Sequence, residues 1–217
     1  MEEIIYPYQY FAIQNQVKFL ISSYQSVNDP KTIEAVQAQA VEEINQILDD
    51  LSEEQIFAEF KEVILDRSLT NEKADRLLLN IKEVVIPFKI PTNKQLEKTF
   101  KKVKKLKVPN FESFDLKESS FIGWNDPGNQ KKFIIYYADG KLEGIYGNQS
   151  NDSIKNVCSI CHKTSQVALF LATTKTGSEG TYTKKGNYIC TDSQNCNRQI
   201  IDINHFENFT QEVKFQK

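Results

Sequence analysis

The four cysteines are the residues of this chain whose types and spacing could do chemistry. Cys158 and Cys161 form a Cys-x-x-Cys pair, and Cys190 and Cys196 form a Cys-x5-Cys pair after a spacer of 28 residues. Paired thiolates from two separate turns are the soft ligands that a tetrahedral zinc ion requires. A closed four-thiolate site has no open position for water, so its metal stabilises structure without catalysing a reaction. The spacing therefore favours one structural zinc ion in a binding module.

Two disulfides are the alternative use of these cysteines, and they persist only in an oxidising compartment. The first ten residues, MEEIIYPYQY, have neither the basic start nor the apolar core of a signal peptide. No stretch approaches the roughly 20 apolar residues of a membrane span. We therefore expect a cytoplasmic protein with no membrane association, and reduced thiols favour zinc over disulfides.

Catalytic motifs are absent from the sequence. His162 and His205 are its only histidines, and although His162 follows Cys161, four cysteines already complete a zinc shell. The sequence also lacks the motifs of zinc deaminases, P-loop NTPases, α/β-hydrolases and HExxH metalloproteases. We expect no enzymatic activity.

The charge distribution predicts two domains within the 217 residues. Residues 1–90 carry 8 Lys and Arg against 16 Asp and Glu, whereas the remainder carries 19 against 13. Pro87 and Pro91 exclude a continuous helix between the two parts and favour an extended connector. We expect a helical bundle over residues 1–86 and an α/β domain over residues 87–217, with its metal-binding part at about 155–217.

Residues 8–86 predict four amphipathic helices, because apolar residues recur there at spacings of three and four. Asp29 before Pro30 is a typical start for the second helix. Ser52 with Gln55 resembles a capping box at the start of the third, and Thr70 is placed to cap the fourth. Short connections between such helices favour an antiparallel bundle.

A lysine-rich helix is predicted after the connector. Thr92 and Gln95 form a second capping box, and apolar residues with helical spacing continue to Leu106. Five lysines crowd its other faces: Lys98, Lys101, Lys102, Lys104 and Lys105. Such a face can be solvated, or it can contact phosphates. A zinc-finger module that binds ribosomal RNA through this helix is therefore an alternative function.

The sequence after Pro109 changes to a strand pattern. Strands are expected at 119–124, 132–137, 142–147, 167–171 and 187–190, followed by a helix from about Asn197 to Lys214. The order around the cysteines is then a turn, a strand hairpin and a helix that contains Cys196, as in a treble-clef zinc finger. The predicted fold class is α+β: an N-terminal four-helix bundle followed by an α/β domain with a C-terminal treble-clef four-cysteine zinc finger.

Three residues beside the cysteines are candidates for contacting a protein partner. Lys185 and Tyr188 precede Cys190, and Phe209 lies on the final helix. A lysine and two aromatic residues on a metal-stabilised surface suit a binding hot spot. From the residues alone, Tyr188 and Phe209 could equally pack the small core of the finger, so both roles remain open.

Several separated motifs resemble the FusB-type fusidic acid resistance proteins, also called elongation factor G-binding proteins. They occur in family order together with all four cysteines, and they span nearly the whole chain: Ile5-Tyr6-Pro7, FKKVKKLK at 100–107, SSFIGWN at 119–125, YTKKGNYIC at 182–190 and Asp202-Ile203-Asn204.

This resemblance implies an N-terminal helical bundle, a treble-clef zinc finger and binding of elongation factor G, chiefly through the C-terminal domain. It also implies release of that factor from ribosomes stalled by fusidic acid, so the ribosome is an indirect partner of a protein that we expect to be a monomer. The family's partner-binding residues match Lys185, Tyr188 and Phe209. The family often has phenylalanine just before the first cysteine, where this chain has Val157.

Overall fold

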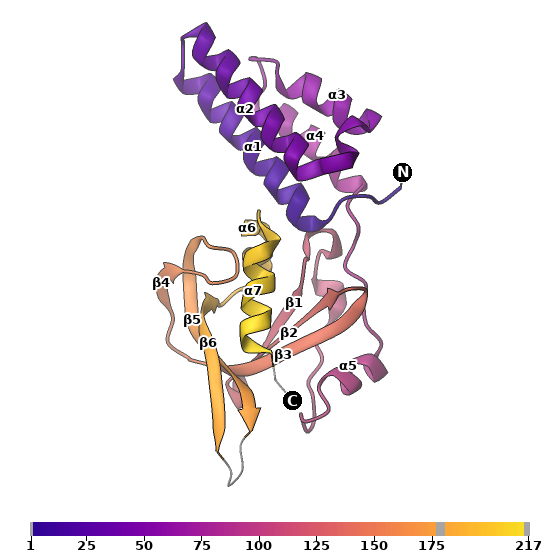
Figure 1. The fold of residues 1–217 in the computed structure, drawn as a ribbon, viewed down its shortest axis with the longest axis vertical. Coiled ribbons are helices and arrows are strands. Elements are labelled where there is room, and N and C mark those ends of the chain that lie inside the picture. The colour runs from indigo at the N-terminus through magenta and orange to yellow at the C-terminus, as the bar shows by residue number, and fades with distance from the viewer. Residues whose placement is uncertain (1, 177–180, 215–217) are drawn as a thin grey trace. The chain divides into compact units, whose positions relative to one another are not determined.

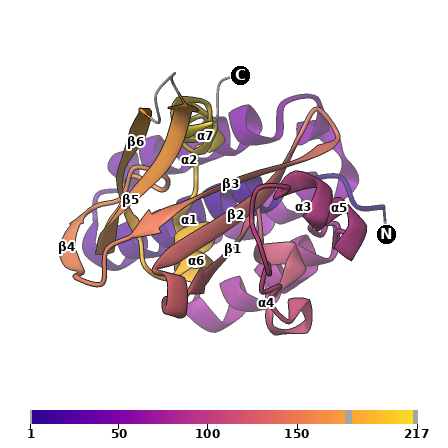
Figure 2. The ribbon, with the colours of Figure 1, turned by 90° about the horizontal axis from the view of Figure 1, so that it is seen from below.

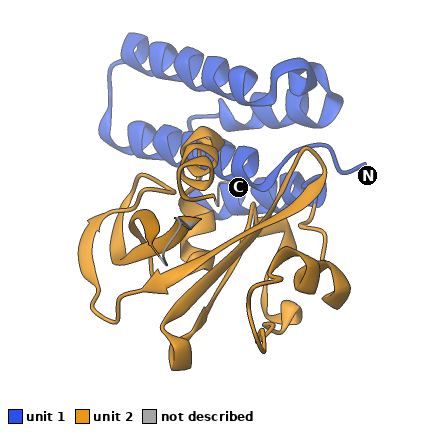
Figure 3. Ribbon diagram, turned by 60° about the horizontal axis from the view of Figure 1, so that its bottom comes forward, with its two compact units in different colours: residues 1–86 blue, residues 87–217 orange. Residues whose placement is uncertain are grey.

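The structure of this protein is a computed structural model that describes residues 2–176 and 181–214 (Figure 1). The chain forms two compact units, residues 1–86 and 87–217, which Figure 3 colours separately. The boundary lies in the segment that contains Pro87 and Pro91. Among the described residues, no helix is both long enough and apolar enough to cross a membrane.

The first unit contains the four expected helices: α1 Pro7–Ser26, α2 Pro30–Leu48, α3 Gln55–Ile64 and α4 Asn71–Glu83. Their apolar faces form one core, in which Ile13, Ile44 and Phe57 have no exposed surface. The N-terminal segment closes this core, because Ile5 pairs with Val85 in a parallel bridge and is completely buried.

Two of the three predicted helix starts in this unit are confirmed. The Asp29 carboxylate accepts a hydrogen bond from the Thr32 amide (2.8 Å), and the Thr70 hydroxyl accepts one from the Lys73 amide (3.3 Å). The predicted capping box of Ser52 is wrong. Ser52 lies inside the 3-10 helix η1, Asp49–Glu53, and α3 begins at Gln55 without a side-chain cap.

The second unit is built on one antiparallel sheet. Its strands are β1 Ile122–Asp126, β2 Lys131–Ala138, β3 Lys141–Gln149, β4 Ile154–Val157, β5 Thr164–Thr176 and β6 Tyr182–Cys190. The order is β1-β2-β3-β5-β4. Strands β3 and β4 pair with different parts of one edge of β5, and β6 pairs with the opposite edge. Figure 2 shows β2 and β3 lying side by side along their length. The sequence did not predict β4, a short strand whose residues are all exposed.

Both faces of the β2 strand are buried, so its apolar run does not alternate with polar residues. Phe133 and Ile135 belong to an aromatic core with Phe100 and Trp124. Successive side chains of a strand point to opposite faces, so Lys132, Ile134 and Tyr136 face the other way. Tyr136 there meets Phe206 of helix α7, Ile203–Val213, with ring centroids 5.3 Å apart.

The lysine-rich helix is shorter than predicted. The Thr92–Gln95 capping box is present, but α5 covers only Asn93–Thr99. Phe100 turns out of the helix into the aromatic core, where it is 2% exposed. A Cβ atom at Gly144 would lie 2.7 Å from the Phe100 ring, so only glycine leaves room for it. Burial of Phe100 therefore ends the helix, and the lysines that follow it lie in turns.

The single C-terminal helix that was predicted is two helices. The α6 helix covers Ser193–Gln199, and α7 starts four residues later. Ile200 between them is completely buried, and the Asp202 carboxylate accepts a hydrogen bond from the Asn204 amide (2.9 Å) at the start of α7. A buried apolar residue followed by a new N-cap separates the two helices.

Candidate metal centre and partner surface

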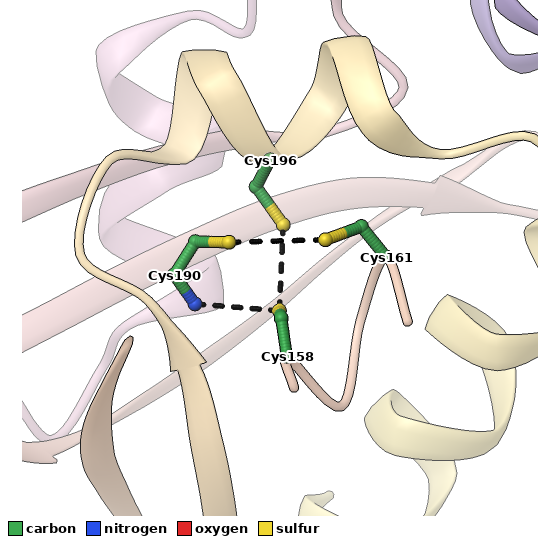
Figure 4. Close-up of side chains that lie close together, drawn as sticks. All are labelled: Cys158, Cys161, Cys190 and Cys196. Carbon is green, nitrogen blue, oxygen red and sulfur yellow. Dashed lines mark hydrogen bonds between the residues drawn. The ribbon is translucent and has the colours of Figure 1, made fainter. Parts of the chain in front are cut away.

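Three elements bring the four cysteines together. Cys158 and Cys161 lie in the turn between β4 and β5, Cys190 is the last residue of β6, and Cys196 lies in α6. All four side chains are buried and point toward one centre (Figure 4). The turn, hairpin and helix around them are the arrangement that the sequence predicted.

The sulfur positions fit a tetrahedral zinc ion. The Sγ atoms of Cys158 and Cys196 are 3.8 Å apart, as are those of Cys161 and Cys190, and all four lie within 4.8 Å of one another. Zinc–sulfur bonds of about 2.3 Å in a tetrahedron require separations of about 3.8 Å. These distances exceed the roughly 2 Å of a disulfide bond, and all four cysteines are free. The donor set therefore fits zinc and excludes the two disulfides.

The backbone around Cys158 favours its thiolate. The amide groups of Ile160 and Cys190 each donate a hydrogen bond to Cys158 Sγ at 3.3 Å. Hydrogen bonds from the other cysteines, that of Cys161 foremost, lower the pKa of the Cys158 thiol. Zinc binds thiolates, so a sulfur that loses its proton readily is a suitable ligand.

Gln199 contacts the centre from the end of α6. Its Oε1 atom lies 3.3 Å from Cys161 Sγ and accepts a hydrogen bond from the thiol. A metal-bound thiolate has no proton to donate, so the NH₂ group of Gln199 must face the sulfur when metal is bound. Gln199 would then stabilise the Cys161 thiolate of a metal-loaded centre with an N–H···S hydrogen bond.

The two histidines lie next to each other beside the centre. His162 has a φ of 54°, and its ring stacks on that of His205 with centroids 3.5 Å apart. This contact joins the cysteine turn to α7. The sequence did not predict this contact, because no spacing rule links positions on separate elements.

Two of the predicted contact residues lie on opposite faces of β6. Lys185 pairs with Ala172 and Tyr188 with Leu169 of β5. An odd separation along a strand turns side chains to opposite faces. Lys185 is exposed and Tyr188 is half-buried, on the face that also carries Cys190. Val157, at the end of β4, is 53% exposed.

Phe209 is in the core of the second unit. It is 4% exposed, and its ring lies 6.0 Å from that of Phe170. The structure therefore shows the packing role that the sequence had left open for this residue. A direct contact between Phe209 and a partner stays a prediction.

An exposed aromatic residue on the same hairpin was not singled out from the sequence. Tyr182 is 59% exposed, and the Lys184 ammonium lies 5.2 Å from the centre of its ring. Even separations place Tyr182, Lys184 and Tyr188 on one face of β6. Once the bounds of β6 are known, the alternation of its side chains between two faces identifies Tyr182 as a candidate for contacting a partner.

Two family profiles match the chain in succession. "Elongation factor G-binding protein, N-terminal" matches residues 4–89, and "FBP C-terminal treble-clef zinc-finger" matches residues 96–214. The second profile agrees with the cysteine geometry described above.

A solved structure resembles the whole chain. "Structure of the fusidic acid resistance protein FusC" is 41% identical, with a TM-score of 0.90, and the match covers 98% of this chain and 98% of that one. A comparison with curated proteins found no match. On the two profiles and this likeness, the chain belongs to the FusB-type family of elongation factor G-binding, fusidic acid resistance proteins.

Proposed function

We propose that this protein binds elongation factor G and promotes its release from ribosomes stalled by fusidic acid, so that translation continues in the presence of the drug. The observation that carries the proposal is the 41% identity to FusC over 98% of both chains, with one fold throughout. Identity at this level over full length supports a shared partner and a shared role.

The second unit offers a surface suited to a protein partner. The hairpin of β5 and β6 ends at the metal centre, so a bound zinc ion would fix its base through Cys190. Tyr182, Lys184 and Tyr188 line one face of β6, and Lys185 is exposed on the other. Tyrosine and lysine groups on a rigid support are typical of binding hot spots. We infer that elongation factor G contacts both faces of this hairpin.

Release follows from binding alone and needs no catalytic group. A ligand shifts a conformational equilibrium only by its differential affinity for the states. We infer that this protein binds elongation factor G most tightly in a conformation that leaves the ribosome. Its own role is then non-enzymatic, with one structural zinc ion, and we expect it to act as a monomer in the cytoplasm.

A contact with ribosomal RNA is the second candidate. Lys101, Lys102, Lys104 and Lys105 are exposed after α5, in turns rather than on a helix face. Binding through phosphates would weaken linearly with the logarithm of salt concentration. Reversal of these charges would then abolish binding to ribosomes, whereas binding to elongation factor G alone would not change.

Direct binding tests the leading proposal. Purified, zinc-loaded protein is expected to form a stable complex with elongation factor G without ribosomes, measured by calorimetry. Lys185→Ala and Tyr182→Ala should each weaken the complex while zinc content is unchanged, and Lys141→Ala, at an exposed position on β3, serves as the control. Absence of any complex would overturn the proposal.

A further inference from the structure

Lys132 is a charged residue inside the second unit. Lys132 is 2% exposed, and its side chain lies on the face of β2 opposite Phe133. Burial of an ammonium group costs free energy unless the charge is compensated. A buried lysine in the sheet of a small domain therefore requires an anionic neighbour.

The hydrogen-bond partners of Lys132 do not supply that charge. Its Nζ donates to Asn125 Oδ1 at 3.2 Å and to the backbone oxygen of Thr191 at 3.0 Å. Both acceptors are neutral. Among the described residues, no carboxylate forms an ion pair with Lys132.

The hydrogen bond to Thr191 places Lys132 beside the four-cysteine centre. Thr191, whose carbonyl binds the ammonium, directly follows Cys190. Burial lowers the pKa of Lys132 to about 8, and the negative charges of Cys196, Cys190, Asp192 and Cys158 oppose this fall. Four thiolates on one zinc ion form a doubly negative centre. Metal binding therefore supplies the negative charge that the two neutral hydrogen-bond acceptors of Lys132 do not.

We propose that Lys132 is the buried counter-cation of the four-cysteine centre, and that its positive charge is a determinant of zinc affinity. The inference rests on the proposed zinc ion. It assigns to β2, remote in sequence from every cysteine, a part in holding the metal. Asn125 acts with it as a positioning residue, since its amide oxygen accepts from Lys132 and its NH₂ group donates to the Thr191 carbonyl at 3.4 Å.

A purely structural role for Lys132 predicts something different. If Lys132 only joined β1 and β2 to the loop before α6, its loss would destabilise metal-free and metal-loaded protein equally. Charge balance predicts a selective effect, because zinc binding releases the remaining thiol protons and so completes the doubly negative four-thiolate centre.

Zinc affinity, measured by competition with a chromogenic chelator, tests the proposal. Lys132→Gln is expected to weaken zinc binding about ten- to a hundredfold, the range typical of groups that support metal ligands. Lys155→Gln, at an exposed position on β4, should match native protein. Asn125→Ala should weaken binding less than Lys132→Gln, since it removes no charge. If native protein itself binds no zinc, the zinc proposal fails, whereas native affinity in Lys132→Gln overturns only the role of Lys132.

Unfolding in urea provides the second measurement. Trp124 is the only tryptophan and is 8% exposed within the second unit, so its fluorescence follows that unit. Lys132→Met should lower the stability of zinc-loaded protein and leave that of zinc-free protein nearly unchanged. Equal losses in the two forms, or equal effects of Asn125→Ala and Lys132→Gln on zinc affinity, would contradict the proposal.

Discussion

The side chain of Asn197 pairs with the backbone of Phe121 as a neighbouring strand would. Asn197 Oδ1 accepts a hydrogen bond from the Phe121 amide at 3.2 Å, and its Nδ2 donates to the Phe121 carbonyl at 2.9 Å. Asn197 directly follows the candidate metal ligand Cys196, and Phe121 directly precedes β1. One amide group therefore fixes the helix of the last ligand to the sheet.

Replacement of this amide should destabilise the second unit. Asn197→Ala leaves the Phe121 amide and carbonyl buried without partners, which is expected to lower the free energy of unfolding by about 2–3 kcal/mol. The measurement is urea unfolding of zinc-loaded protein followed by Trp124 fluorescence. Asn195→Ala on the same helix, where the side chain is half-buried, is the control. A loss no larger than that of the control would show that the pairing contributes little.

Phe209 and Lys185 should respond differently to truncation, because one is buried and the other exposed. Phe209→Ala is expected to cost about 3–5 kcal/mol of stability through the cavity that it leaves. Lys185→Ala should leave stability within about 0.5 kcal/mol and weaken only the complex with elongation factor G. Thermal unfolding and calorimetric titration of both variants separate the two effects. Unchanged stability in Phe209→Ala would contradict its place in the core.

Val157 is an exposed position at which a larger apolar side chain should strengthen partner binding. Val157→Phe restores the residue type implied by the family resemblance. Burial of the additional apolar surface is worth about 1 kcal/mol, or about a fivefold lower Kd for elongation factor G. Val157→Ser is the matched change in the opposite direction and should raise Kd. Equal affinities for both variants would place Val157 outside the interface.

Asp29 makes the stability of the first unit depend on pH in the acidic range. The hydroxyl and amide of Thr32 donate hydrogen bonds that lower the pKa of Asp29 below its ordinary value of 3.8. The stabilisation is therefore complete above pH 3.8 and is lost as the pH falls through the lower pKa of the folded state. Asp29→Asn removes this titration. The variant should therefore be less stable than native protein at neutral pH, and this difference in stability should shrink below pH 3.8. Urea unfolding of both proteins, followed by the circular dichroism of the helices, measures the difference. A difference in stability that does not change with pH would contradict the role of Asp29 as a helix cap.

The sequence predicted what is local and missed what depends on packing. The cysteine spacing, the Thr92–Gln95 capping box and the Asp29 cap involve neighbouring residues, and the structure contains all three. The sequence predicted the end of α5 too late in the chain. That end depends on the fit of the Phe100 ring against Gly144, which lies 44 positions later.

The candidate site shows the same division. The four candidate metal ligands followed from residue types and spacing, whereas Lys132 belongs to a strand far from them in sequence. The partner surface was predicted as one cluster, but strand alternation separates Lys185 from Tyr188, and burial removes Phe209 from the exposed set. Neither property can be read before the bounds and neighbours of β6 are known.

Ribosome-dependent GTP turnover by elongation factor G tests the central claim most directly. With fusidic acid present, addition of zinc-loaded protein is expected to restore turnover toward the drug-free rate. Lys185→Ala should restore it less well, while zinc content and stability remain native. No recovery of turnover at concentrations that saturate elongation factor G would contradict the account.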